Sequence, residues 1–106
     1  MVKDETEAVA MIMAEAMFRV ACGAGRVIDY DKERQRYYLP KARAVLKVFC
    51  QSTSTGDSLA EQAAEASFIA TENPIGWRYS DYRIYYLPGA QAALAEAAAS
   101  VMKANQ

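Results

Sequence analysis

The sequence predicts an all-α fold, in which two duplicated helical hairpins pack as one four-helix domain. Three observations support this fold class. Alanine dominates an apolar fraction of 53%, and alanine favours helices that approach one another closely. Apolar residues recur at three- and four-residue steps, which is the period of an α-helix. The motif Tyr-Tyr-Leu-Pro-x-Ala-x-Ala-x-Leu occurs twice, beginning at Tyr37 and again at Tyr85.

A second segment of the sequence is also repeated. Residues 14–18 (Ala-Glu-Ala-Met-Phe) resemble residues 64–68 (Ala-Glu-Ala-Ser-Phe), so the two echoes occur in the same order at spacings of 50 and 48 positions. Such spacings lie in the range of internal repeats. We expect a single domain over residues 1–106, with repeated units at approximately 4–51 and 57–104.

The first predicted helix covers residues 4–22. Acidic residues crowd its start, where they favour the positive end of the helix dipole, and Gly23 and Gly25 end it. Its apolar residues lie on more than one side, so we expect this helix to be buried on most of its circumference. These residues are Val9, Met11, Ile12, Met13, Ala16, Met17, Phe18, Val20 and Cys22.

Asp29 or Asp31 is predicted to cap the second helix. Pro40 lies inside it, lacks a backbone donor and disfavours helical geometry at the preceding residue, so we expect a kink there. The alternative is an α+β fold with two short hairpins, in which residues 27–39 form a β-hairpin before a short helix with Pro40 in its first turn. The core-facing positions of the long helix are Tyr38, Leu39, Ala42, Val45, Leu46 and Phe49.

The Ser/Thr-rich segment 51–56 is the predicted junction between the two units. Asp57 or Ser58 then caps a third helix, which extends to about Thr71, and a turn is expected at residues 73–76. The third helix is poor in large side chains. Its expected inward positions are Leu59, Ala63, Ala66, Ile69 and Ala70.

Ser80 is predicted to cap the fourth helix, which extends to about Lys103. The periodic positions of this helix keep their phase across Pro88, which a β-hairpin followed by an independent helix would have no reason to do. This continuity favours a second helix kinked near its proline over the α+β alternative. The positions are Ser80, Ile84, Leu87, Gln91, Leu94, Ala98 and Val101.

The chain contains no histidine. Without histidine there is no Ser-His or Cys-His nucleophile system, no usual zinc site and no ordinary general base near neutral pH. Glu15 and Glu65 hold matching places in the two units, but a di-iron bundle also needs Glu-x-x-His on partner helices. We therefore expect no enzymatic activity, no cofactor and no metal.

The two cysteines, Cys22 and Cys50, are too few for a disulfide framework. If the first two helices are antiparallel neighbours, their thiols lie ~20–30 Å apart and form no disulfide. The first residues lack the features of a secretory signal, and no apolar run approaches the ~18–20 residues of a membrane span. We expect a cytoplasmic protein with no membrane partner.

Two surfaces are candidates for binding a partner. On the second helix, four basic residues fall within roughly 60° of one another at about 100° per residue, beside the core face. On the far side, Tyr37, Ala44 and Val48 form a second apolar strip. Either this strip meets a partner, or Tyr37 and Val48 pack on another helix of the same domain. We name the four basic residues the basic stripe; they are Lys32, Arg36, Arg43 and Lys47.

The second candidate surface interleaves aromatic residues with arginine. Such clusters form the centres of protein interfaces or stack unpaired bases, and their rings can equally fill space around a kink. A net charge of −1 ranks protein contact above nucleic acid. The cluster comprises Trp77, Arg78, Tyr79, Tyr82, Arg83, Tyr85 and Tyr86. From it, Trp77, Arg78, Tyr82 and Arg83 join the basic stripe and Tyr37 as candidate partner-binding residues.

The two motif copies at residues 37–46 and 85–94, preceded by an alanine-rich helix with Glu15-Ala16, resemble the short helical proteins encoded by bacteriophages and prophages. The resemblance covers residues 8–50 and, more faintly, 60–98. It implies a phage accessory protein acting in the bacterial host cell, a class that includes inhibitors of defence systems such as anti-CRISPR proteins.

The expected function is a non-enzymatic protein-interaction module that binds and inhibits or modulates a host protein or protein complex. One alternative is a nucleic-acid-binding accessory protein that uses the same basic stripe. The other is a self-associating structural module, with Tyr37, Ala44 and Val48 at a homodimer interface.

Overall fold

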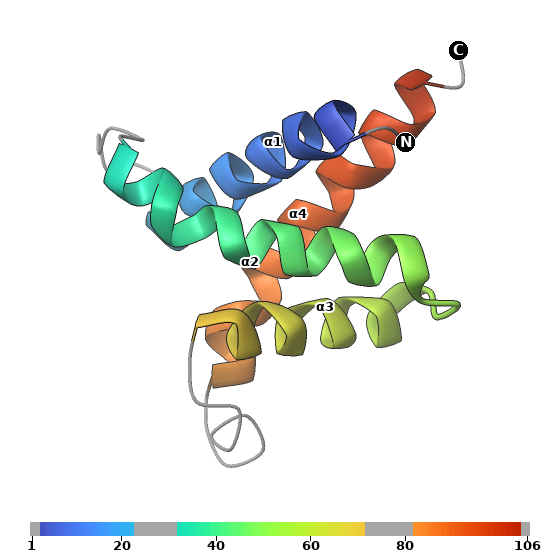
Figure 1. Ribbon diagram of the computed structural model, residues 1–106. Helices are drawn as coiled ribbons and strands as arrows, with labels where there is room; N and C mark the ends of the chain where they lie inside the picture. Colours follow the sequence, from blue (N-terminus) through green and yellow to red (C-terminus); the bar gives the residue numbers. More distant parts are fainter. Residues whose placement is uncertain (1–2, 23–31, 72–81, 105–106) are drawn as a thin grey trace.

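The computed structural model describes residues 3–22, 32–71 and 82–104, with the backbone alone described at 3, 4, 22, 71, 82–85, 103 and 104 (Figure 1). Within these ranges the chain forms four α-helices and no strand. The all-α four-helix fold is thereby confirmed. The helices are α1 (Lys3–Cys22), α2 (Lys32–Gln51), α3 (Gly56–Thr71) and α4 (Tyr82–Ala104).

The prolines of the two motif copies, Pro40 and Pro88, lie inside long helices. Pro40 falls within α2 and Pro88 within α4, and both are exposed. Residues 32–39 and 82–87 are helical, so the α+β alternative is wrong for these segments. The helical phase that the sequence keeps across each proline is the physical reason, because one continuous helix keeps the apolar positions on one side. The kinks near the two prolines stay predictions.

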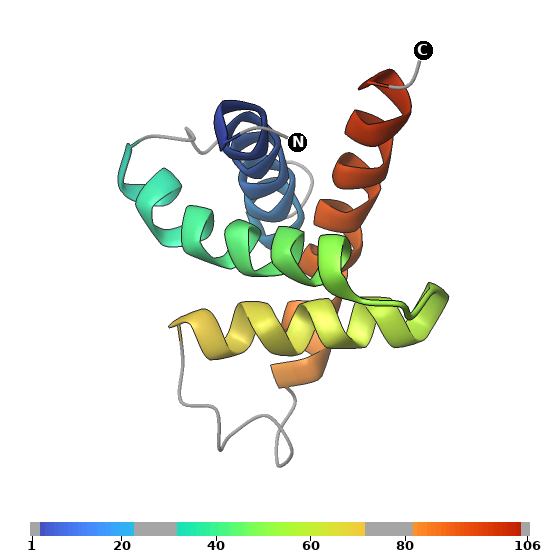
Figure 2. The same cartoon turned by 45° about the vertical axis from the view of Figure 1, so that its right-hand side comes forward.

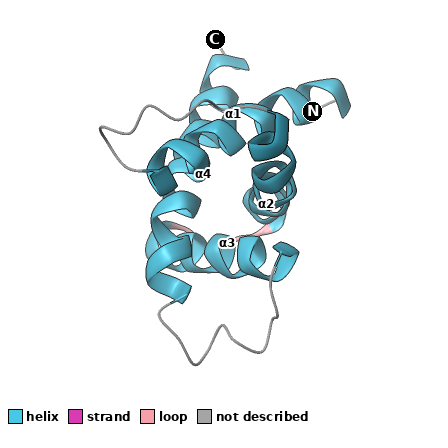
Figure 3. Cartoon of the chain, turned by 90° about the vertical axis from the view of Figure 1, so that its left-hand side faces the viewer, coloured by secondary structure: helices cyan, strands magenta, loops and turns pink. Residues whose placement is uncertain are grey.

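The helices pack in a closed ring (Figure 3). α1 packs on α2, α2 on α3, α3 on α4, and α4 returns to α1, while α2 and α4 also touch across the middle. In the described part of the chain α1 and α3 make no contact. Figures 1 and 2 show α2 and α3 lying side by side. Exchanging the first helical pair for the second reproduces the same set of helix contacts.

The core repeats in the same way. In α1 and in α3 the matching buried positions are separated by 50 residues, and half of them are alanine, which allows the helices to approach closely. The internal repeat remains a prediction, and this match of buried positions supports it. The buried residues are Ala10, Met13, Ala14, Met17 and Phe18 in α1, and Ala60, Ala63, Ala64, Ser67 and Phe68 in α3.

Helices α2 and α4 complete the core at matched positions of the repeated motif. Lys41 and Gly89 are both buried, and so are the alanines that follow them, Ala42 and Ala90. One turn later Val45 in α2 is matched by a buried Ala93 in α4. The core face predicted for α2 is confirmed, because Ala42, Val45 and Leu46 are buried and Tyr38, Leu39 and Phe49 pack against them.

The predicted burial of α1 on most of its circumference is wrong. Met11, Ile12 and Val20 are 47%, 48% and 43% exposed, and Ile69 of α3 is 49% exposed. In α4, two of the periodic positions, Gln91 and Ala98, are exposed, and the buried residues among those described are Gly89, Ala90, Ala93 and Ala97. The helices contact one another mainly at alanine positions. The larger apolar side chains named above therefore lie at the edges of these contacts and stay partly exposed.

The α2–α3 connection is held by side chains. Ser52 donates a hydrogen bond to Gln62 (2.8 Å), and Gln62 donates one to Ser54 (2.7 Å). α3 begins at Gly56, whose φ of 60° favours glycine, so Asp57 and Ser58, the predicted caps, lie within the first turn of the helix instead of before it. The predicted caps Asp29, Asp31 and Ser80, the stop at Gly23 and Gly25, and the turn at 73–76 lie outside the described residues.

Cys50 is an exposed free thiol one residue before the end of α2. Cys22 is the last residue of α1, and α2 begins at Lys32 after the connecting segment, so the two cysteines close opposite ends of the helical pair in Figure 1. None of the helices described combines the length and the apolar character needed to cross a membrane.

Candidate functional site

The basic stripe lies along the exposed surface of α2. All four of its side chains are exposed, and α2 carries six basic residues against Glu33. Lys32, Arg36 and Lys47 form no ion pair with any carboxylate of the described residues.

Arg43, the fourth member of the basic stripe, is engaged within the chain. Its guanidinium binds the Glu7 carboxylate of α1 through both oxygens, with Nη2–Oε1 at 2.5 Å and Nε–Oε2 at 3.2 Å. The hydrogen bond from Arg43 to Glu7, assisted by the opposite charge, raises the pKa of the arginine above its ordinary value. Both side chains are half exposed, so the pair links α1 to α2 at the surface.

The residues of the apolar strip of α2 (Tyr37, Ala44 and Val48) differ in their exposure. Val48 packs against the core and Ala44 is half-buried, whereas Tyr37 is 48% exposed. The edge of one tyrosine ring meets the face of the next, with the centroids of Tyr37 and Tyr38 5.0 Å apart. Of the three residues, Tyr37 is the one that presents a large apolar surface to a partner.

The aromatic–arginine cluster is described only in part. Trp77, Arg78 and Tyr79 lie outside the described residues. Tyr82, Arg83 and Tyr85 belong to the first turn of α4, where the backbone alone is described. Tyr86 is the member whose side chain is placed. Its ring meets Phe68 edge-to-face with centroids 5.4 Å apart, and it lines a pocket.

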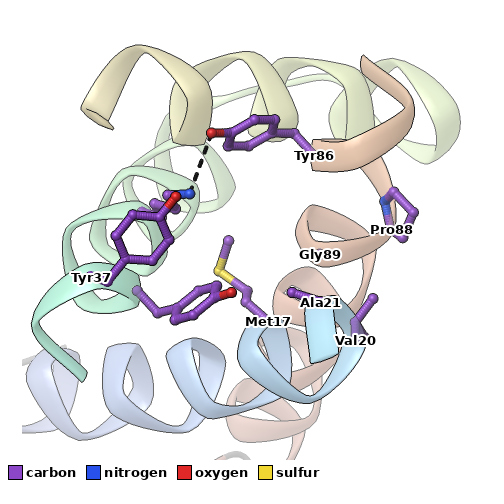
Figure 4. Close-up of a pocket in the computed structure, with 9 residues that line it drawn as sticks. Met17, Val20, Ala21, Tyr37, Tyr86, Pro88 and Gly89 are labelled. Carbon is purple, nitrogen blue, oxygen red and sulfur yellow. Dashed lines mark hydrogen bonds between the residues drawn. The ribbon is translucent and has the colours of Figure 1, made fainter. Parts of the chain in front are cut away.

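This pocket lies where the two motif copies meet (Figure 4). Its volume is about 370 Å³. Figure 4 shows Tyr37 and Tyr86 approaching it from two sides and Met17 from a third. We name it the motif pocket. Its lining residues are Met17, Val20 and Ala21 of α1, Tyr37, Tyr38 and Lys41 of α2, and Tyr86, Pro88 and Gly89 of α4.

Lys41 supplies the charge of the motif pocket. The residue is 4% exposed, and its ammonium donates a hydrogen bond to the Tyr86 hydroxyl at 3.4 Å (dashed line in Figure 4). Three rings surround it, with Nζ 4.1 Å from the centroid of Tyr37, 4.6 Å from that of Tyr86 and 5.6 Å from that of Tyr38. Cation–π attraction of this kind strengthens when the cation is desolvated.

Sequence reasoning missed Lys41, although the repeated motif holds a signal for it. Lys41 and Gly89 occupy the same variable position of the two copies, and both line the motif pocket. At this position, one copy contributes a long cationic side chain and the other contributes no side chain. The site forms because the fold brings these two positions to one pocket.

Comparison of the chain with protein-family models, curated proteins and solved structures gives no match. Two features of the chain bear on function, the exposed face of α2 and the motif pocket. Within the described ranges, no three His, Cys, Asp or Glu side chains gather as metal ligands.

Proposed function

We propose that the chain is a non-enzymatic protein-interaction module that binds an acidic protein surface through the exposed face of α2. One observation carries the proposal: Lys32, Arg36 and Lys47 are exposed along one face of α2 with no described carboxylate paired to them, and the same helix exposes about half of Tyr37. Arginine and tyrosine are enriched among the residues that dominate binding energy at protein interfaces.

The charge distribution favours a protein partner over nucleic acid. The chain has eight basic and three acidic residues between positions 19 and 50, but four basic and ten acidic residues elsewhere. A long polyanion would meet the acidic remainder as well as the basic stripe. A compact acidic patch on a protein matches one helical face and avoids this repulsion.

The resemblance to phage-encoded helical proteins adds the expectation that the partner belongs to the bacterial host, including its defence systems. Self-association through Tyr37, Ala44 and Val48 is the weaker alternative, because Val48 packs against the core and leaves Tyr37 as the exposed member.

Charge reversal on α2 tests the proposal. Arg36→Glu and Lys47→Glu together should lower the capture of the partner from bacterial lysate about tenfold or more, because each reversal replaces attraction with repulsion. Arg19→Glu is the matched control, since it reverses an exposed arginine on α1. Circular dichroism confirms that each variant is folded before capture.

The lysate is divided into nuclease-treated and untreated halves, and the capture is repeated at several salt concentrations. Capture that survives nuclease, weakens with salt and is lost in the α2 variant supports the proposal. Equal capture by the folded α2 variant and the wild type contradicts it. If nuclease treatment abolishes the capture, the α2 face binds nucleic acid instead of a protein.

A further inference from the structure

The motif pocket has properties that protein docking on α2 does not use. Its cation is buried, whereas the docking residues are exposed. An ammonium has three N–H donors. In the described part of the chain Lys41 donates to the Tyr86 hydroxyl alone, at 3.4 Å, and forms no ion pair. A buried charge is costly unless it is paired and hydrogen-bonded, so this ammonium favours an anion as a further partner.

The walls of the motif pocket define the rest of that partner. Met17, Val20 and Pro88 present apolar surface, and the tyrosines present ring faces and hydroxyl groups. A volume of about 370 Å³ lies at the small end of the ~300–1,000 Å³ typical of small-molecule sites. The pocket therefore suits a compact organic molecule with an apolar body.

The charge balance selects a monoanion. A dianion such as phosphate is usually held by several basic groups, and Lys41 is the one cation lining the pocket among the described residues. A cage of tyrosine rings also suits an organic cation, but Lys41 already lies within those rings and repels a second positive charge. A single carboxylate on an aromatic body satisfies both the charge and the rings.

The divergence between the two motif copies supports a built site. Lysine at both variable positions would bring two like charges into one cavity, and glycine at both would leave no cation. The observed pair, Lys41 and Gly89, provides one cation with open space opposite. A Cβ atom at Gly89 would lie 3.9 Å from Met17, in ordinary contact, so close packing of the backbone does not require glycine there.

We infer that the motif pocket binds a small aromatic monocarboxylate, with the carboxylate on the Lys41 ammonium and the aromatic ring among Tyr37, Tyr38 and Tyr86. The motif pocket shares Tyr37 with the α2 docking face, but its charged group is the buried Lys41, and benzoate binding there does not depend on the proposed function.

Titration of the full chain with benzoate, followed by amide NMR spectra, tests the inference. We expect saturable shifts centred on residues 17–21, 37–41 and 86–89, with a dissociation constant of ~1 mM or tighter. Benzamide keeps the ring without the charge and acetate keeps the charge without the ring, so both should bind about tenfold or more weakly than benzoate. Shifts that do not saturate, or equal binding of benzamide and benzoate, overturn the inference.

Lys41→Met removes the charge and keeps a long, flexible side chain, so the pocket stays filled to a similar extent. It should weaken benzoate binding about tenfold or more, whereas Lys47→Met, at an exposed lysine of the same helix, should leave it unchanged. Equal effects of the two variants contradict the assignment of Lys41.

A second pair of variants tests the cavity without changing a charge. Gly89→Leu places a side chain against Met17 and into the motif pocket, and should weaken benzoate binding. Ala98→Leu adds the same group at an exposed position of α4 and should leave binding unchanged. Unaltered binding in a folded Gly89→Leu variant would place benzoate elsewhere. Arg36→Glu with Lys47→Glu should keep benzoate binding, which separates failure of this inference from failure of the docking proposal.

Discussion

At the scale of single residues, Lys41 shows how a charged group is accommodated inside an alanine-rich core. Its side chain passes between Tyr37 and Tyr86, and the rings and the Tyr86 hydroxyl take the place of part of its hydration. The same contacts position the ammonium at the wall of the motif pocket. Burial of Lys41 thus has a structural explanation in the tyrosines and a functional one in the pocket.

The two placed glycines predict opposite responses to the same substitution. Gly89→Ala should raise the free energy of unfolding by about 0.5–1 kcal/mol, because glycine is unfavourable inside a helix and the added methyl group makes ordinary contact with Met17. Gly56→Ala should lower it by about 1 kcal/mol, because φ is 60° there although the space is open. Urea denaturation measures both, and changes of the same sign would contradict this account.

At the scale of elements, the contact of α1 with α2 combines burial with one surface ion pair. Phe18 packs edge-to-face on Tyr38, with ring centroids 5.8 Å apart, and the Arg43–Glu7 pair joins the same two helices at the surface. Side chains with half of their surface in water gain little from such a pair. The aromatic contact therefore contributes more to the stability of this helical pair than the ion pair does.

Arg43→Gln should lower the free energy of unfolding by about 0.5–1 kcal/mol, and the loss should shrink at high salt. The raised pKa of Arg43 means that its contribution is fully present below the unfolded-state pKa and is lost only as pH rises through the folded-state value. The difference between wild type and variant should therefore stay constant from about pH 6 to about pH 10. A difference that vanishes within this interval contradicts the assignment.

Arg19→Gln is the matched control for this measurement. Arg19 pairs with Glu15 at 2.6 Å inside α1, and among the described residues it forms no ion pair with a second helix. Its loss should cost at most about 0.3–0.5 kcal/mol, the usual value for neighbours one turn apart on a helix. A larger effect at Arg19 than at Arg43 would contradict a role for Arg43 in joining α1 to α2.

The four helices could be predicted from the sequence because periodicity and turn residues act locally. The continuous helical phase across Pro88 was enough to favour helix over hairpin. The exposed side of α1 could not be predicted, because the size of Met11 and Ile12 suggested burial while the close contacts are made by Ala10 and Ala14. A prediction from hydrophobicity expects the largest apolar side chains to be buried, whereas closely packed helices bury small side chains such as alanine.

The motif pocket could not be predicted because its parts are brought together by the fold. Lys41 and Tyr86 are 45 positions apart, and their contact depends on how α2 and α4 cross. Arg43 shows the same limit. Its place on α2 beside the other basic residues could be read from the sequence, but its bond to Glu7 of α1 could not. Positions along one helix were predictable, and partners on another helix were not.

At the scale of the whole molecule, matched residues of the two units make matched contacts. Phe18 meets Tyr38 at an interplanar angle of 69°, and Phe68 meets Tyr86 at 87°, each within its own helical pair. The two pairs are also interleaved, because α1 packs on α4 and α3 packs on α2. Unfolding one pair would expose the core face of the other, which predicts a single cooperative transition.

Phe18→Leu and Phe68→Leu test this prediction together. Each should lower the free energy of unfolding by about 1–2 kcal/mol, and by similar amounts, because each removes one edge-to-face contact at a matched buried site. Ile69→Ala, at a side chain 49% exposed, should cost less, about 0.5–1 kcal/mol. Unfolding is followed by helical circular dichroism and by tyrosine fluorescence. Coincident transitions in both variants support one shared core, whereas separate transitions would show that each helical pair unfolds alone.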